Sequence, residues 1–418
     1  MTAATLRVNT PEGPANVTNP LLQYNFPKGM AISDIFPYPT GFAALNYTAR
    51  NYNLSTGESD DQASSASLLA ASASRIIVLY HLLSSTNNWD QFSAISVGGD
   101  ASLEALHGWI HNDIGGYFNG IAHGHMTMFT MSAFDPVFWL HHANVDRITA
   151  IWQALNPDSY VEPAPNAGGT YFQPANQVDN IDSALAPFHT DDNNTMWTAR
   201  MARGTSTFGY TYPELVDWNV SASELKGTVQ QKVNQLYNPN PPPTVNVTRR
   251  MRLRRSANLA GIMSNVHADS ALELGVNNLD TQWYLRISIP ASMQASAYFF
   301  VGNAPASAES WSRAKNLVGS YVPPFGYPSS SSAQQIDVPC THTIAAAVDR
   351  GILQDFGAGP VVSFLRTSVV SKVISTTGGT ESDNIQISIL SRAVEPRKSL
   401  TEFPVYGRFQ NHGLLSVS

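Results

Sequence analysis

Hydrophobic residues recur with helical spacing in three segments of the first 160 residues. The segment Ala63–Leu83 is apolar along most of its length, and Ser102–Asn112 repeats the pattern over a shorter stretch. The third segment, Asp135–Leu155, begins with Asp135 followed by Pro136, which is typical of a helix N-cap and first turn. The pattern predicts three helices, whereas residues 1–60 and 156–215 are rich in Pro, Gly and Asn and predict loops that pack on them.

A change of pattern divides the chain near residue 235. Residues 238–243 read NPNPPP, which is typical of a stiff extended linker, and the basic cluster Arg249–Arg255 follows. The basic cluster is interpreted as a solvated linker, with acid binding or proteolysis as the alternatives. Beyond it, short β-rich segments bounded by turns predict strands, namely Trp283–Ile289, Ala297–Val301, Val361–Leu365 and Ile385–Leu390.

The predicted architecture therefore has two parts and a joint. Residues 1–235 form a mainly α N-terminal domain, a partial helical bundle with long loops. Residues 236–255 form a Pro/Arg-rich linker, and residues 256–418 form a β-rich, sandwich-like C-terminal domain. A chain of 418 residues agrees with two domains.

Composition and charge exclude several classes of partner. The formal net charge of −7 argues against a nucleic-acid-binding protein, which needs a cationic face. The most apolar run, Ile76–Leu83, is too short to span a bilayer, so no membrane span is expected. The first residues, MTAATL, show no secretory signal, so a cytoplasmic or otherwise intracellular location is expected.

Cysteine and histidine usage indicates where metal chemistry would come from. The single cysteine, Cys340, excludes an internal disulfide framework, four-thiolate zinc sites and iron–sulfur clusters. The chain has eleven histidines. Any metal site must therefore rely on imidazole.

Two groups of histidines have the spacing of metal ligands. His107 and His111 are four residues apart on a predicted helix, so both leave the same face. His141 and His142 lie in a helix of large apolar residues, where a buried imidazole needs a partner. Adjacent helical residues point about 100° apart, so one of this pair can join the first two, and helix geometry does not say which.

The neighbours of the second pair leave two interpretations open. Phe138 lies one helical turn before His142, and Asp146 lies one turn after it, where a carboxylate could orient an imidazole. The alternative for Asp146 is an ion pair with Arg147 at the helix surface.

Three neutral imidazoles with an open position suit copper or zinc, and no nearby carboxylate completes a 2-His-1-carboxylate iron site. The zinc signature His-Glu-x-x-His is missing, as are G-x-S-x-G, Walker A and G-x-G-x-x-G patterns. Esterase, nucleotidase and dinucleotide-binding functions therefore have no support.

Several motifs together resemble the second copper site of tyrosinases. They are LEALHGWIHNDIGG at 103–116, GHM at 124–126 and SAFDPVFWLHHANVDR at 132–147. FGYTYPEL at 208–215 looks like the tyrosine motif that closes the fungal tyrosinase core, and NPLLQYNF at 19–26 agrees as well. The resemblance covers residues 1–235, and the remainder looks like the fungal C-terminal domain that shields the active site.

The resemblance assigns a role to individual residues. It implies that His107, His111 and His142 are the copper ligands and that His141 is a core residue or supports the ligands. Glu104 matches a family glutamate that holds a water near copper and helps to deprotonate phenols.

Phe138 corresponds to a phenylalanine that packs between the copper imidazoles. Two positions favour o-diphenols over monophenols. Gly108 stands where hydroxylating members often carry Asn or Asp, and Phe129 stands where catechol oxidases carry a bulky gate.

The resemblance also implies that the half of the copper domain that carries the first copper site is missing. The family uses two coppers held by six histidines, but the first histidine here is His81, and the first site's three histidines are expected to precede position 1. One copper site is thus encoded here, which points to a truncated gene model, a partial sequence or a degenerate paralogue.

The expected function is copper-dependent oxidation of small phenols and o-diphenols by O₂ to o-quinones that form melanin-type pigment, with diphenols favoured. The alternative is a non-catalytic copper-binding paralogue that acts as an interaction partner, since this chain alone is expected to turn over weakly or not at all. A zinc or mononuclear copper hydrolase is a third hypothesis.

Overall fold

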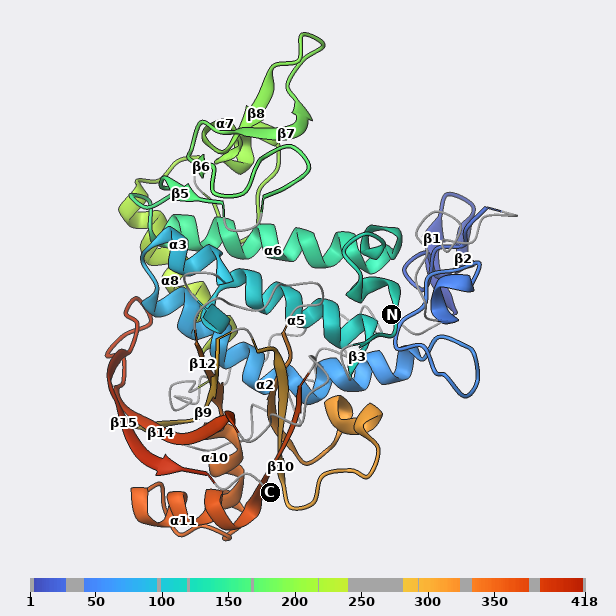
Figure 1. The fold of residues 1–418 in the computed structure, drawn as a ribbon. Helices are drawn as coiled ribbons and strands as arrows, with labels where there is room; N and C mark the ends of the chain where they lie inside the picture. Colours follow the sequence, from blue (N-terminus) through green and yellow to red (C-terminus); the bar gives the residue numbers. More distant parts are fainter. Residues whose placement is uncertain are drawn as a thin grey trace.

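The computed structural model places a layer of helices between an arm of short strands and a strand-rich C-terminal part (Figure 1). It describes residues 4–27, 41–95, 99–118, 121–166, 169–216, 218–239, 281–291, 293–323, 333–375 and 384–415. The basic cluster Arg249–Arg255, most of the expected linker and residues 256–280 lie outside the described residues.

The helical layer contains the three helices that the hydrophobic pattern predicts. They are α2 (Asp61–Ser85), α5 (Leu103–Gly115) and α6 (Pro136–Leu155). The other α-helices among the described residues of this half are α3 (Trp89–Ser93), α7 (Ala199–Ala202) and α8 (Ala222–Tyr237). Short 3-10 turns connect them: η1 (Gly41–Ala44), η2 (Gly99–Ala101), η3 (His125–Thr127), η4 (Ser132–Phe134) and η5 (Thr205–Phe208).

Side-chain caps explain where the three long helices begin. Asp60, Ser102 and Asp135 each accept a hydrogen bond from a backbone N–H of the first turn of α2, α5 and α6, respectively. Pro136 occupies the first helical position of α6. At the end of α5, Gly116 adopts a positive φ of 88°, which a residue with a side chain rarely adopts.

The first 60 residues contain regular structure that the loop-rich composition did not predict. Strands β1 (Thr5–Thr10) and β2 (Gly13–Thr18) form an antiparallel hairpin. Gly13 lies at its turn with a φ of 111°. Along β1, exposed side chains alternate with partly buried ones, and no residue of either strand is fully buried.

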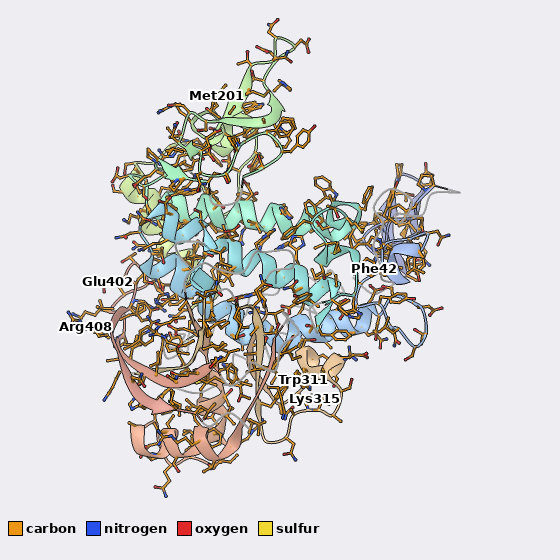
Figure 2. All side chains as sticks on the ribbon, viewed as in Figure 1. Phe42, Met201, Trp311, Lys315, Glu402 and Arg408 are labelled. Atoms are coloured by element: carbon orange, nitrogen blue, oxygen red, sulfur yellow. The ribbon has the colours of Figure 1, made fainter. Side chains whose placement is uncertain are left out.

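Residues 156–215, also expected as loops, form the arm and include short strands. These are β5 (Ala164–Pro165), β6 (Val178–Asp179), β7 (Ala184–His189) and β8 (Met196–Thr198), while β3 (Tyr117–Phe118) and β4 (Ile121–Ala122) pair after α5. Met201 marks the arm in Figure 2, far from the strand-rich part.

Two antiparallel sheets form the C-terminal part, as the strand-rich pattern predicts. One has the order β12-β9-β14-β15 and the other β11-β10-β13. Their strands are β9 (Thr281–Ile289), β10 (Ala295–Val301), β11 (Leu317–Tyr321), β12 (Gln334–Pro339), β13 (Val369–Ser375), β14 (Gln386–Glu395) and β15 (Val405–Leu414). Helices η6 (Ala308–Arg313), α10 (Thr341–Asp349) and α11 (Ala358–Ser368) complete it.

One predicted strand of this part is wrong. Val361–Leu365 lies inside helix α11. The buried residues there are Val361, Phe364 and Leu365, which follow the spacing of three and four residues of one helix face. A run of five apolar and small residues cannot distinguish the two structures by itself, and here packing of that face selects the helix.

The hydrophobic core crosses the expected domain boundary. Leu82 of α2, Leu106 of α5 and Trp283 of β9 belong to one continuous buried cluster. Polar contacts follow the same path: Tyr80 donates to Asn234 Oδ1 at 2.6 Å, and Asn234 Nδ2 donates to the Leu400 carbonyl at 2.7 Å. The helical layer and the sheets therefore share one packed interior.

Helix α2 is long and apolar enough to cross a membrane by length and composition. A core helix passes the same test, and α2 contacts α5, α8 and β11. Its residues Ile77, Tyr80 and Leu83 are buried.

Candidate metal centre

Helix α5 supplies two imidazoles from adjacent turns. His107 and His111 lie four residues apart on α5, and their Nε2 atoms are 3.0 Å from each other. The next residue after His111 also ties the helix to the C-terminal part, because Asn112 Nδ2 donates to the Pro323 carbonyl at 3.2 Å. The helix is therefore held one residue away from a candidate ligand.

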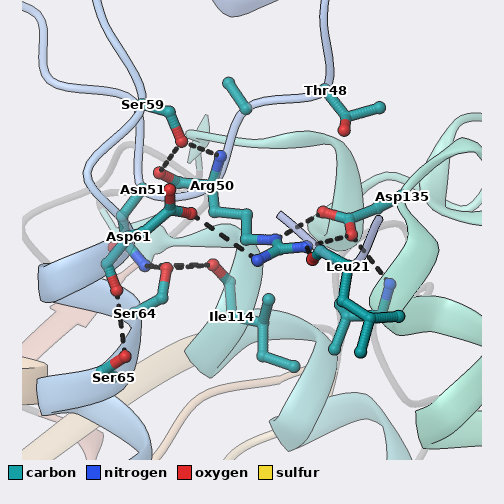
Figure 3. Close-up of polar contacts among 12 residues, drawn as sticks. Leu21, Thr48, Arg50, Asn51, Ser59, Asp61, Ser64, Ser65, Ile114 and Asp135 are labelled. Atoms are coloured by element: carbon teal, nitrogen blue, oxygen red, sulfur yellow. Dashed lines mark hydrogen bonds and ion pairs between the residues drawn. The ribbon is translucent and has the colours of Figure 1, made fainter. Parts of the chain in front are cut away.

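Helix α6 supplies the third imidazole, and a buried ion pair fixes where this helix begins (Figure 3). Asp135 accepts from the Val137 N–H at 3.0 Å, and Arg50 donates to both of its carboxylate oxygens, at 2.8 and 2.6 Å. Both partners are almost fully buried. The same carboxylate therefore makes both the ion pair with Arg50 and the helix cap, seven residues before His142.

The three imidazoles meet at their Nε2 atoms. His142 Nε2 lies 3.3 Å from His107 Nε2 and 3.2 Å from His111 Nε2. Three nitrogens bound to one tetrahedral metal ion at about 2.0 Å would lie about 3.3 Å apart. The three Nε2 atoms therefore have the spacing that a shared metal ion requires, and we call them the triad.

A backbone carbonyl fixes the protonation of His111. Its Nδ1 lies 2.5 Å from the Met126 carbonyl oxygen, to which only a protonated nitrogen can donate. In the neutral ring this leaves a lone pair on Nε2, which faces the other two histidines. Met126 lies on the turn η3, in the GHM motif at 124–126, to which the sequence assigned no role in orienting a ligand.

The neighbouring His141 is excluded from the triad by its own hydrogen bond. His141 Nε2 lies 3.1 Å from the His107 carbonyl oxygen and donates to it. The corresponding nitrogen of His142 instead faces the triad. The structure thus brings together the three histidines that the resemblance implies and resolves what helix geometry left open.

Burial keeps the triad neutral. The pKa of His107 is lowered to about 3 and that of His142 to about 4, in both cases first by burial and then by the other imidazoles. Burial also lowers the pKa of His111, against its hydrogen bond to Met126. Neutral imidazoles are the form that binds a metal ion.

Phe138 packs where the sequence places it. Its ring stacks on His142 with centroids 3.9 Å apart and lies 5.9 Å from the ring of His111, edge to face. One aromatic ring therefore contacts a candidate ligand from each helix.

The structure places the remaining candidates at the edges of the site. The Glu104 carboxylate accepts from the Ile95 N–H at 2.7 Å, and burial raises its pKa against that hydrogen bond. Gly108 is buried in α5 next to His107, and Phe129, on the loop after η3, is 51 % exposed. The backbone of Glu104 hydrogen-bonds to His107, which raises the pKa of that imidazole against the effect of burial. No described hydrogen bond or ring contact joins the Glu104 carboxylate or the Phe129 ring to the triad, and the roles of these side chains stay predictions.

Neither interpretation of Asp146 is correct. Its Oδ2 accepts from the hydroxyls of Tyr210 and Tyr212, at 2.7 and 2.6 Å. Arg147 pairs instead with Glu214. The tyrosine motif therefore binds the end of the arm to α6 through Asp146, a partner that the spacing of residues in the sequence did not indicate.

Three other histidines of the helical half have contacts outside the triad. His81 contacts Arg392, His123 stacks on Phe118, and His125 accepts from the Ala49 N–H. Within the described part of the chain, the triad is the one group of three His, Cys, Asp or Glu side chains close enough to hold a metal ion.

Comparison with known proteins shows similarity to tyrosinases and polyphenol oxidases. Residues 1–155 match the model of the common central domain of tyrosinase. The chain is 34 % identical over 249 residues to a tyrosinase of Podospora anserina, covering 57 % of this chain and 42 % of that protein. It is 36 % identical over 202 residues to polyphenol oxidase 4 of Agaricus bisporus, covering 47 % of this chain and 32 % of the relative. The chain thus spans less than half the length of these curated relatives.

Solved structures extend the likeness of the fold over nearly the whole chain. The structure of recombinant mushroom tyrosinase matches with a TM-score of 0.73 at 23 % identity, over 98 % of this chain and 73 % of the other. An Aspergillus oryzae pro-tyrosinase mutant matches with a TM-score of 0.59 at 17 % identity, over 100 % and 70 %. The chain is therefore similar to tyrosinases in two ways: residues 1–155 match the tyrosinase central domain, and the fold as a whole matches that of the mushroom enzyme.

Proposed function

We propose that the triad binds one copper ion and serves copper-dependent oxidation of phenols by O₂. The observation that carries this proposal is the triangle of Nε2 atoms with edges of 3.0–3.3 Å, in a chain similar to tyrosinases. The donor set fits copper because all three donors are neutral imidazoles, and imidazole sites bind Cu²⁺ more tightly than the other divalent first-row metals.

Bound copper would supply the redox chemistry, accepting electrons from the phenol and passing them to O₂. In the overall reaction two o-diphenols each lose two electrons and two protons, and one O₂ becomes two water molecules. The chain's own residues hold the site: Met126 orients His111, and Phe138 packs against His142. The o-quinones would then polymerise to melanin-type pigment.

The proposed substrates are o-diphenols in preference to monophenols. Gly108 follows the first ligand without a side chain that could hold a water, and Phe129 is a bulky, half-exposed ring. Glu104 has a raised pKa, which suits a group that exchanges protons with a phenol, although it is bound here to Ile95.

The gate assignment has a direct test. Replacing Phe129 by Ala should increase the monophenol to diphenol ratio of kcat/KM in a form of the enzyme that carries both copper sites of the family. An unchanged ratio would remove Phe129 from the specificity proposal, and Phe134→Ala, which changes another half-exposed ring, is the control.

A second candidate function is a copper-binding protein without turnover. It is supported by the single ligand group among the described residues, because the family chemistry pairs two coppers. Copper analysis of the purified chain combined with O₂ uptake on catechol separates the two candidates. One copper with no catechol-dependent O₂ uptake favours the second candidate, and copper-dependent uptake favours the first. Two results would contradict both candidates: no copper in the wild-type chain, or copper binding by His111→Ala equal to that of wild type.

A further inference from the structure

His141 is the fourth imidazole of the cluster, and neither the metal nor the phenol chemistry uses it. The side chain is only 9 % exposed. Its Nε2 donates to the His107 carbonyl oxygen at 3.1 Å, and its ring lies parallel to that of His107, with centroids 5.2 Å apart and an interplanar angle of 7°. One side chain of α6 thus contacts both the backbone and the ring of a candidate ligand on α5.

This contact lies where the relative position of the two ligand helices determines the spacing of the Nε2 atoms. His107 and His111 leave α5, whereas His142 leaves α6, so the Nε2 spacing depends on how the helices sit against each other. A sliding of one helix by a fraction of an ångström would change two of the three spacings, because both involve His142. Metal ligands are sensitive to such displacements.

We propose that His141 is a positioning residue that holds α6 in register with α5 at the triad through its hydrogen bond to the His107 carbonyl. This proposal rests on the copper site proposed above. It concerns the protein's affinity for copper and the geometry of the bound ion, and not the oxidation of phenols.

The neighbouring contacts do not supply the same constraint. Phe138 stacks on His142 but makes only ring contacts, which permit sliding. The Arg50–Asp135 ion pair fixes the beginning of α6, about two turns before His142. The contacts of His142 Nε2 with His107 and His111 run through the triad itself, whereas the hydrogen bond of His141 joins the two helices beside it.

Two substitutions separate the hydrogen bond from the ring. His141→Phe keeps an aromatic ring beside His107 and removes the donor, whereas His141→Gln places an amide N–H near the position of Nε2 and removes the ring. The matched control is His189→Gln, an exposed histidine of the arm strand β7. The affinity of the full chain for Cu²⁺ is measured by competition with a chelator, and the bound ion is characterised by electron paramagnetic resonance.

Loss of the donor should weaken Cu²⁺ binding by about tenfold or more, the usual effect of removing a group that orients a metal ligand. The spectrum of His141→Phe should also show altered copper hyperfine splitting. His141→Gln should recover most of the affinity and the wild-type splitting, and His189→Gln should match wild type. Urea unfolding of the metal-free proteins reports any loss of stability.

Several results would overturn the proposal. They are wild-type affinity and splitting in His141→Phe, equal losses in His141→Phe and His141→Gln, or an affinity loss no larger than the loss of metal-free stability explains. If His141→Phe does not fold, wild-type affinity and splitting in His141→Gln support the proposal, and their loss contradicts it. Failure of the copper site itself is distinguishable, because then wild type and His142→Ala would bind Cu²⁺ equally weakly.

Discussion

The three Nε2 atoms of the triad lie within 3.3 Å of one another, and separate contacts hold the rings in this arrangement. His111 is held by the Met126 carbonyl, and His142 by the ring of Phe138. Burial removes the option of protonation, since it lowers the pKa of His107 to about 3. At the residue scale, the site is prepared for a cation before one binds.

The Phe138 ring should contribute measurably to this preparation. Phe138→Leu keeps an apolar side chain of similar size but removes the stack on His142, and a contact between aromatic rings contributes about 0.5–1.5 kcal/mol. We therefore expect Cu²⁺ affinity to fall by up to about tenfold. Competition titration measures this loss, and Phe134→Leu, on the turn before α6, is the control. Equal affinities of Phe138→Leu and wild type would contradict the role of the stack.

At the element scale, two helices and one buried ion pair account for most of the site. Helix α6 begins at Pro136 because Asp135 caps it, and Arg50 keeps that carboxylate in place from a segment 85 residues earlier in the chain. Arg50 also donates to the Leu21 carbonyl at 2.8 Å, so one guanidinium joins three segments. Burying such an ion pair costs desolvation free energy. Removing one partner is costlier still, because it leaves the other charge buried without compensation.

Arg50→Met should therefore destabilise the protein strongly. Leaving Asp135 buried without its partner is expected to lower the free energy of unfolding by about 3–5 kcal/mol. The control is Arg200→Met, which breaks the exposed Arg200–Asp182 pair and should cost at most about 1 kcal/mol. Urea unfolding at neutral pH compares the variants. Similar losses for both would mean that the Arg50 pair does not hold the start of α6.

Local sequence signals made these helices predictable, whereas features that depend on contacts between distant segments could not be predicted. Ser102, Asp135 and Pro136 mark the starts of α5 and α6 within a few residues of sequence. The choice between His141 and His142 depends on where the other helix lies, which periodicity does not contain. The same reason explains why α11 was expected as a strand, because its buried face is defined by what it packs against.

The whole molecule is one packed body in which the strand-rich part supports the ligand helices. Arg392 of β14 donates to His81 Nε2 of α2 at 2.6 Å and packs over the ring of Tyr406, so charge and aromatic surface meet between the two halves. The pKa of His81 is lowered to about 3, first by burial and then by Arg392. His81 thus stays neutral in the folded protein.

This interface should weaken in acid. Between pH 6.5 and about 3 the unfolded chain binds a proton at His81 that the folded protein does not, so the free energy of unfolding falls as pH falls. A single histidine of this kind contributes a slope of up to about 1.4 kcal/mol per pH unit. Urea unfolding at pH 7 and pH 5 should show a smaller loss for His81→Gln than for wild type. Equal losses would remove His81 from the acid sensitivity, and His189→Gln should behave as wild type.

The central claim is that one copper ion binds between α5 and α6 on three Nε2 atoms. An anomalous difference map at the copper edge, from crystals of the purified chain loaded with Cu²⁺, tests it directly. The account predicts one peak about 2.0 Å from the Nε2 atoms of His107, His111 and His142. No peak between these histidines, or a peak bound to His141 in place of His142, would contradict it.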